Sequence, residues 1–145
     1  YTWQVSNEEL EKITVQYPFS LAKEIIKFSK NCHFVLLSGE GADRTERSIF
    51  PFAKFKGCIE NKLLSLGFKK VYCCRPGYIF PEKPRKEPNW TYAMIRKCYK
   101  LVQKVIPGFG IRSGQLAKAM FNIGMSDLNK DIFSNQDLKK YSLLT

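Results

Sequence analysis

Apolar positions recur at helical spacing between residues 6 and 30 and then gather into a short continuous run. The repeat of three or four residues predicts a helix over 6–30, with a kink or break at Pro18. Ser6 and Glu9 have the Ser-x-x-Glu spacing of a capping box and mark the start of this helix. The apolar run over residues 33–38 ends at a Gly-Glu-Gly turn, so it predicts a buried parallel strand.

The same order of elements follows once more along the chain. Apolar positions predict a helix over residues 51–66, closed by Gly67, and then a second buried strand over residues 70–75. Helix, strand, helix and strand with short links predict the α/β class, with a Rossmann-like parallel sheet flanked by helices. Residues 1–145 are expected to belong to a single domain, since this length and an apolar content of 44% suit one core.

The last part of the chain is predicted to be a mostly helical tail over residues 89–141. The segment before it, residues 81–88, contains three of the seven prolines and is predicted to be a loop. Within the tail the pattern predicts two helices, a short strand and a final helix, at residues 90–105, 113–123, 132–133 and 135–141.

The charge balance is strongly basic, with 24 Lys and Arg against 13 Asp and Glu and a net charge of +11. Such an excess favours anionic partners: a phosphorylated cofactor, nucleic acid or an acidic membrane surface. No stretch approaches the roughly 18 consecutive apolar residues of a membrane span, so none is expected. The sequence also begins without the basic start and apolar core of a signal peptide.

The five cysteines and the single histidine do not form a metal-binding pattern. The cysteines are irregularly spaced, no Cys-x-x-Cys pair occurs, and His33 opens a predicted strand, where a structural role is expected. We therefore predict buried free thiols, no metal site and a cytoplasmic location.

Three short motifs lie at the ends of the predicted strands and on the helix between them. Ser38-Gly39-Glu40-Gly41 follows the first strand, and Arg75-Pro76-Gly77-Tyr78 follows the second. The intervening helix carries Phe52-x-x-x-Lys56-x-x-x-Glu60. Because ligands of open α/β sheets bind outside the carboxyl ends of the strands, these motifs are predicted to line one binding site.

In order and separation, these motifs resemble the short-chain dehydrogenase/reductase superfamily, in particular its atypical, epimerase- and Tat-interacting-protein-like members. The resemblance covers roughly residues 8–140 and implies the carboxyl-terminal part of an NAD(P)-binding Rossmann-like domain. It implies NAD or NADP as cofactor and a small molecule as substrate. It assigns catalysis to Ser38, which would contact the substrate oxygen, and to Lys56, which would hold the nicotinamide ribose. The resemblance places the remaining cofactor contacts at Arg75, Pro76, Gly77 and Tyr78.

The chain departs from that pattern at positions that matter for chemistry. The family's general acid/base is a Tyr four residues before the Lys, and here Phe52 occupies that position as a pocket-wall or core aromatic. Gly39 stands where relatives often carry a second Ser after Ser38. The glycine-rich turn that cradles a pyrophosphate does not occur, so the phosphate-binding amino-terminal half is expected to be absent from this chain.

Three functions are consistent with these observations. The first is an NAD(P)-binding protein that acts as an oxidoreductase or epimerase on a small substrate. The second, which Phe52 favours, is a catalytically inactive binding or regulatory module with the same fold. The third is a basic nucleic-acid-binding protein, although no helix-turn-helix, zinc or RNA-recognition motif occurs. No pattern in the chain sets the oligomeric state.

Plainer structural roles stand beside the functional ones. Lys56 taken alone is read as an ordinary lysine on a helix surface, and the flanking strand ends favour the ribose-binding role. For Ser38, closing a turn after the strand and contacting a substrate are held equally. Glu46 and Glu60 form a candidate pair of carboxylates, which the spacing does not require to meet. The basic residues 83–86 are read either as a solvated loop or as a grip for the phosphate of a cofactor or nucleic acid.

Overall fold

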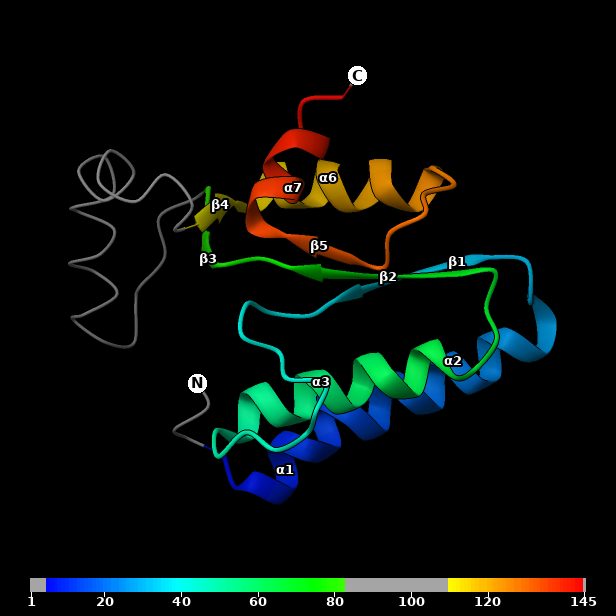
Figure 1. Cartoon of the computed structure of the whole chain (residues 1–145), viewed down its shortest axis with the longest axis vertical. Coiled ribbons are helices and arrows are strands. Elements are labelled where there is room, and N and C mark those ends of the chain that lie inside the picture. The colour runs from blue at the N-terminus through cyan, green and yellow to red at the C-terminus, as the bar shows by residue number, and fades with distance from the viewer. Residues whose placement is uncertain (1–4, 83–109, 145) are drawn as a thin grey trace.

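A three-stranded parallel sheet forms the centre of the chain in the computed structural model, which describes residues 5–82 and 110–144. Its strands are β1 (His33–Leu37), β2 (Lys70–Arg75) and β5 (Ile132–Ser134), with β2 in the middle. Helices cover both faces of this sheet (Figure 1). The predicted α/β class, with a parallel sheet flanked by helices, is therefore confirmed.

One face of the sheet is covered by helices that come from the first half of the chain. These are α1 (Asn7–Glu11), the π-helical turn η1 (Lys12–Gln16), α2 (Tyr17–Phe28) and α3 (Pro51–Leu64). Ser6 caps α1 by accepting a hydrogen bond from the Glu9 backbone N–H at 3.2 Å. The sequence predicted a kink or break at Pro18, but the helix continues through this residue. A wider turn precedes the proline, in which the Tyr17 N–H donates to the Lys12 carbonyl, and the helix continues beyond it.

The opposite face is covered by helices from the end of the chain, α6 (Ser113–Met125) and α7 (Asn135–Tyr141). A separate pair of parallel strands, β3 (Tyr78–Phe80) and β4 (Gly110–Arg112), joins the sheet region to α6. Neither strand was predicted, because three residues are too few to show an alternating pattern. The predicted helix over 90–105 and the basic loop over 83–86 lie outside the described residues.

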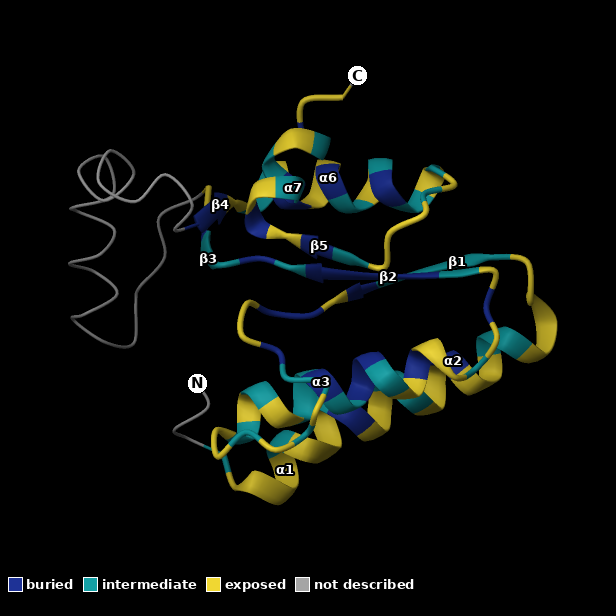
Figure 2. Ribbon diagram, in the orientation of Figure 1, coloured by how far each residue is buried: buried dark blue, intermediate teal, exposed yellow. Residues whose placement is uncertain are grey.

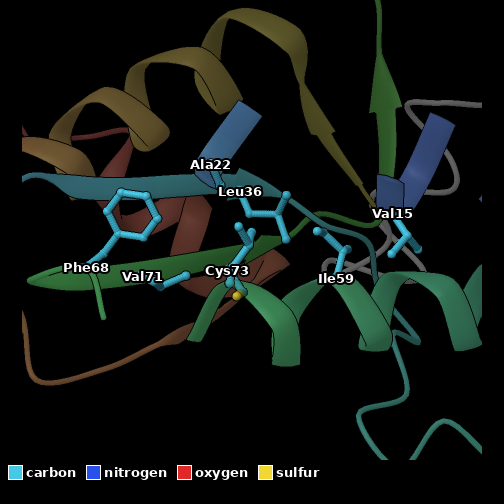
Figure 3. Close-up of a cluster of buried hydrophobic side chains, with 8 residues drawn as sticks. Val15, Ala22, Leu36, Ile59, Phe68, Val71 and Cys73 are labelled. Atoms are coloured by element: carbon cyan, nitrogen blue, oxygen red, sulfur yellow. The ribbon is translucent and has the colours of Figure 1, made fainter. Parts of the chain in front are cut away.

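The alternation of side chains along β2 explains why its sequence is continuously apolar. Val71 and Cys73 belong to the core beneath α2 and α3, whereas Tyr72 and Cys74 belong to the core beneath α6 and α7. Figure 3 shows the first of these cores, in which Leu36 and Ile59 meet Val71 and Cys73. Buried residues accordingly follow the sheet and the helix sides that face it (Figure 2). A strand buried on both faces has no polar side, as predicted.

The cysteines within the described residues are free thiols. Cys73 and Cys74 are buried in the centre of the sheet, and burial raises the pKa of each thiol to about 12. Both side chains therefore act as small apolar groups. Over the same part of the chain, none of the helices combines the length and the apolar character that crossing a membrane requires.

Candidate functional site

The two strand ends identified from the sequence lie side by side in the structure. Leu37 pairs with Cys74 in the parallel register, and the Ser38 N–H donates to the Cys74 carbonyl at 2.8 Å. Two residues further, the Glu40 N–H donates to the Pro76 carbonyl at 3.0 Å. The loops after β1 and β2 thus form one continuous edge, where open α/β sheets bind their ligands.

A completely buried carboxylate, Glu60 on α3, ties this edge together. It accepts hydrogen bonds from the Ser38 hydroxyl at 2.5 Å and from Arg44 Nε at 2.7 Å. Arg75 donates to the same carboxylate through Nε at 2.9 Å and through Nη2. Burial alone would raise the pKa of Glu60, but the hydrogen bonds from Arg75, Ser38 and Arg44 outweigh it and lower the pKa. Glu60 is therefore an anion held between two guanidinium groups.

This ion cluster changes the roles predicted for two site residues. The Ser38 side chain is buried and donates its only hydroxyl proton to Glu60, so that proton is not offered to a substrate. The Arg75 side chain faces Glu60 as well. Both side chains are thus partners of Glu60 in this structure, and their predicted contacts with a substrate or cofactor stay predictions.

Lys56 lies one helical turn before Glu60 and reaches the end of β1. Its Nζ donates to the Leu37 carbonyl at 3.0 Å, and the side chain is half-buried. Burial lowers the pKa of the ammonium, and the nearby Glu60 carboxylate opposes this effect. An ammonium has three donors, so Lys56 keeps further N–H groups for a ligand at the strand end.

Phe52 forms an apolar wall beside this lysine. The Lys56 ammonium lies 5.8 Å from the centre of the phenyl ring, which is 40% exposed. The ring also packs against the turn after β1, since a Cβ atom at Gly39 would lie 2.9 Å from its Cζ atom. A larger residue at position 39 would therefore require the Phe52 ring to shift.

The turn after β2 is held by a residue that the sequence interpretation did not include. The Gly77 N–H donates to Asn135 Oδ1 at 3.1 Å, and Asn135 is buried at the start of α7. Tyr78 leaves the edge as the first residue of β3, and its ring packs against Phe80. The turn is thus fixed in place, with the Gly77 donor already occupied.

Other side chains singled out from the sequence have separate partners. Glu46 accepts from Asn61 at 2.9 Å, so its carboxylate has a different partner from the Glu60 carboxylate. His33 lies 2.9 Å from the Gly124 carbonyl through Nδ1 and links β1 to α6. Within residues 5–82 and 110–144, no group of three or more His, Cys, Asp and Glu side chains is placed to hold a metal ion.

Sequence patterns missed Arg44, Asp131 and Asn135. Arg44 Nη1 donates to Asp131 at 2.7 Å, across 87 positions of the chain. Arg44 and Asp131 lie in loops, and Asn135 is the first residue of α7, so no hydrophobic periodicity marks these positions. The partner of each residue is also distant in the sequence. Only the capping pair Ser134 and Asp137, which fixes the start of α7, could have drawn attention to the position of Asn135.

Comparison with known proteins identifies relatives of this chain but no matching family model. The chain is 33% identical over 103 residues to the protein named fmp52, mitochondrial, of Aspergillus niger. It is 30% identical over 101 residues to the protein of the same name in Emericella nidulans and 27% identical over 108 residues to FMP52 of Saccharomyces cerevisiae. These matches cover 68%, 68% and 70% of the chain but only 42%, 42% and 46% of the relatives. The chain therefore spans less than half the length of the relatives it matches.

These relatives correct two predictions made from the sequence. The assignment to the short-chain dehydrogenase/reductase superfamily is contradicted, because the matched proteins are named Fmp52. The motifs behind that assignment are a few residues long, and sheet ends of this kind need Gly, Pro and Ser for their turns in any case. The cytoplasmic location is contradicted as well, because the relatives are named as mitochondrial. Free thiols do not distinguish these compartments.

Proposed function

We propose that the edge formed by the ends of β1 and β2 binds the nicotinamide–ribose part of NAD or NADP. The observation that carries this proposal is Lys56, a half-buried ammonium fixed at the Leu37 carbonyl with donors to spare. Ribose hydroxyls accept hydrogen bonds from such a group, and the exposed Phe52 ring beside it offers a face for a planar ring. The excess of positive charge favours an anionic dinucleotide.

The residues at this edge support binding better than turnover. Phe52 has no proton to transfer, and the Ser38 hydroxyl is committed to Glu60. Because the described residues contain no glycine-rich pyrophosphate turn, they account for one end of a dinucleotide only. We therefore propose a binding or regulatory role for this part of the polypeptide, in mitochondria as the names of the relatives suggest.

Lys56→Met should weaken binding of reduced nicotinamide mononucleotide by about tenfold, the effect of losing one charged hydrogen-bonding group. The 145-residue chain is titrated with this nucleotide, and with NADH in parallel, and binding is followed by nicotinamide fluorescence. Lys54→Met is the matched control, because Lys54 lies on the same helix with an exposed side chain. Affinity unchanged in Lys56→Met, or no saturable binding to the unsubstituted chain, would overturn the proposal.

Phe52→Tyr should leave turnover at background. The new hydroxyl would stand beside Lys56, but the Ser38 hydroxyl would still face Glu60 and no second group would orient a substrate carbonyl. Oxidation of NADH is measured with a panel of aldehydes and ketones. Phe52→Leu is the control, because it changes the apolar surface beside Lys56 without adding a hydroxyl group. Turnover that appears in the tyrosine variant and not in the leucine variant would favour an enzyme over a binding module.

A further inference from the structure

A groove lies at the amino end of β2, where this strand extends beyond its neighbour. β2 begins at Lys70, whereas the pairing with β5 begins only at Cys73 and Ile132. The segment that descends from α6 reaches β5 beside β2 (orange in Figure 1). Between them is a groove of about 410 Å³, a volume within the range of small-molecule sites.

One wall of this groove is formed by residues 128–131, and the segment 126–131 that contains it is anchored to β2 at several points. Tyr72 Oη accepts from the Leu128 N–H at 2.9 Å and donates to the Ser126 carbonyl at 2.8 Å. The Cys73 N–H donates to the Asp131 carbonyl at 2.7 Å. These bonds hold the wall in position in the absence of a ligand, which lowers the cost of ordering a site.

The charges at the groove sum to one positive charge. Lys69 and Lys70 face Asp127, at 2.8 and 3.6 Å, which leaves an excess of one ammonium. Asp127 also raises the pKa of Lys69, so that lysine stays protonated. The other charged residues of the lining are already paired, Asp131 with Arg44 and Lys130 with Asp137.

Neutral donors accompany this charge. Asn129 accepts a hydrogen bond from Lys70 at 3.0 Å through Oδ1, and its amide N–H groups have no hydrogen-bond partner within residues 5–82 and 110–144. The backbone adds another donor. Backbone groups of successive strand residues face opposite sides, and on β2 the Cys74 carbonyl faces β1 whereas the Cys73 N–H faces β5. The Val71 N–H, two residues before Cys73, therefore also faces the β5 side, where β5 does not reach it.

Half of the lining of the groove is apolar, with Leu64, Phe68 and Leu128 among its residues. We propose that it binds an organic carboxylate, that is, a single negative charge on an apolar body. A monoanion matches the excess of one positive charge, and its two oxygens match the ammonium and N–H donors. A neutral apolar molecule would leave these donors without partners, and a phosphate dianion would exceed the available charge.

The test uses 2-naphthoate as the probe, with backbone amide NMR shifts of the 145-residue chain as the readout. We expect saturable shifts centred on Val71 and Asn129, and binding about tenfold weaker for the neutral analogue 2-naphthalenemethanol, because the charge-assisted bonds are lost. Lys70→Gln should weaken naphthoate binding by a similar factor. Lys62→Gln, an exposed lysine on α3 outside the groove, should not change it.

Three results would overturn the proposal. If the neutral analogue bound as tightly as 2-naphthoate, the groove would recognise the apolar ring and not the carboxylate. Shifts centred on Gly39 and Gly77 would place the probe at the opposite end of the sheet, at the site proposed for the dinucleotide. Absence of saturable shifts would show that the groove does not bind this class. None of these results depends on whether the dinucleotide binds, because the two sites share no residue.

Discussion

Glu60→Gln is expected to lower the free energy of unfolding by about 3 kcal/mol at pH 7, the cost of removing one partner from a buried ion cluster. Glu60 is fully buried and balances Arg44 and Arg75, whose side chains are 25% and 19% exposed. Without the Glu60 carboxylate, Arg44 still has Asp131 as an ion-pair partner, whereas Arg75 loses its ion pair with Glu60. The measurement is urea unfolding of the variant and the unsubstituted chain.

The same variant should lose part of the acid sensitivity of the protein. Because the pKa of Glu60 is lowered in the folded state, its contribution to stability is complete above the ordinary value of 4.5 and disappears as the pH falls through the folded pKa. The difference in unfolding free energy between the chain and Glu60→Gln should therefore shrink below about pH 4.5.

An exposed ion pair provides the control for this experiment. Glu24 pairs with Lys27 at 2.7 Å, with side chains that are 63% and 59% exposed. Glu24→Gln should change stability by less than about 0.5 kcal/mol at any pH, because water and salt screen such pairs. If the difference in unfolding free energy between the unsubstituted chain and Glu60→Gln stayed constant from pH 7 to pH 3, Glu60 would not act as a buried anion.

The sequence predicted those parts of the fold that follow from burial alone. β2 was predicted at residues 70–75, the range that the structure shows, because a strand covered on both faces must be apolar throughout. β1 and α3 differ from their predicted ranges only at their last residues. β3 and β4 were missed, since their pairing joins Tyr78 to Gly110 and depends on residues far apart in the chain.

The candidate site shows the same division between what is local and what is not. The sequence could identify Ser38, Lys56 and Arg75 as neighbours, because they follow strands or lie on the helix between them. It could not show that Ser38 and Arg75 donate hydrogen bonds to Glu60, since that depends on how deeply α3 packs against the strand ends. The depth of that packing is set largely by one glycine.

Gly57→Ala should destabilise the protein by about 2–3 kcal/mol, the cost of overpacking a rigid contact. A Cβ atom at position 57 would lie 1.7 Å from the Asp43 carbonyl oxygen and 2.1 Å from its carbon, so α3 or the loop after β1 would have to move. That loop is itself rigid, because the Asp43 carboxylate accepts from the Thr45 N–H at 2.9 Å and from the Ser48 N–H at 2.8 Å. The shift would also draw Arg44 away from Glu60.

Gly114→Ala in α6 is the matched control, because there the nearest atoms belong to the end of the flexible Glu82 side chain. That side chain can move aside, and alanine favours a helix over glycine by about 1 kcal/mol, so this variant should be neutral or more stable. Both variants are compared by urea unfolding, and Gly57→Ala is tested for nicotinamide mononucleotide binding as well. If Gly57→Ala were as stable as Gly114→Ala, helix propensity would outweigh the contact at Asp43. The close approach of α3 would then not be what holds Lys56 and Glu60 at the strand ends.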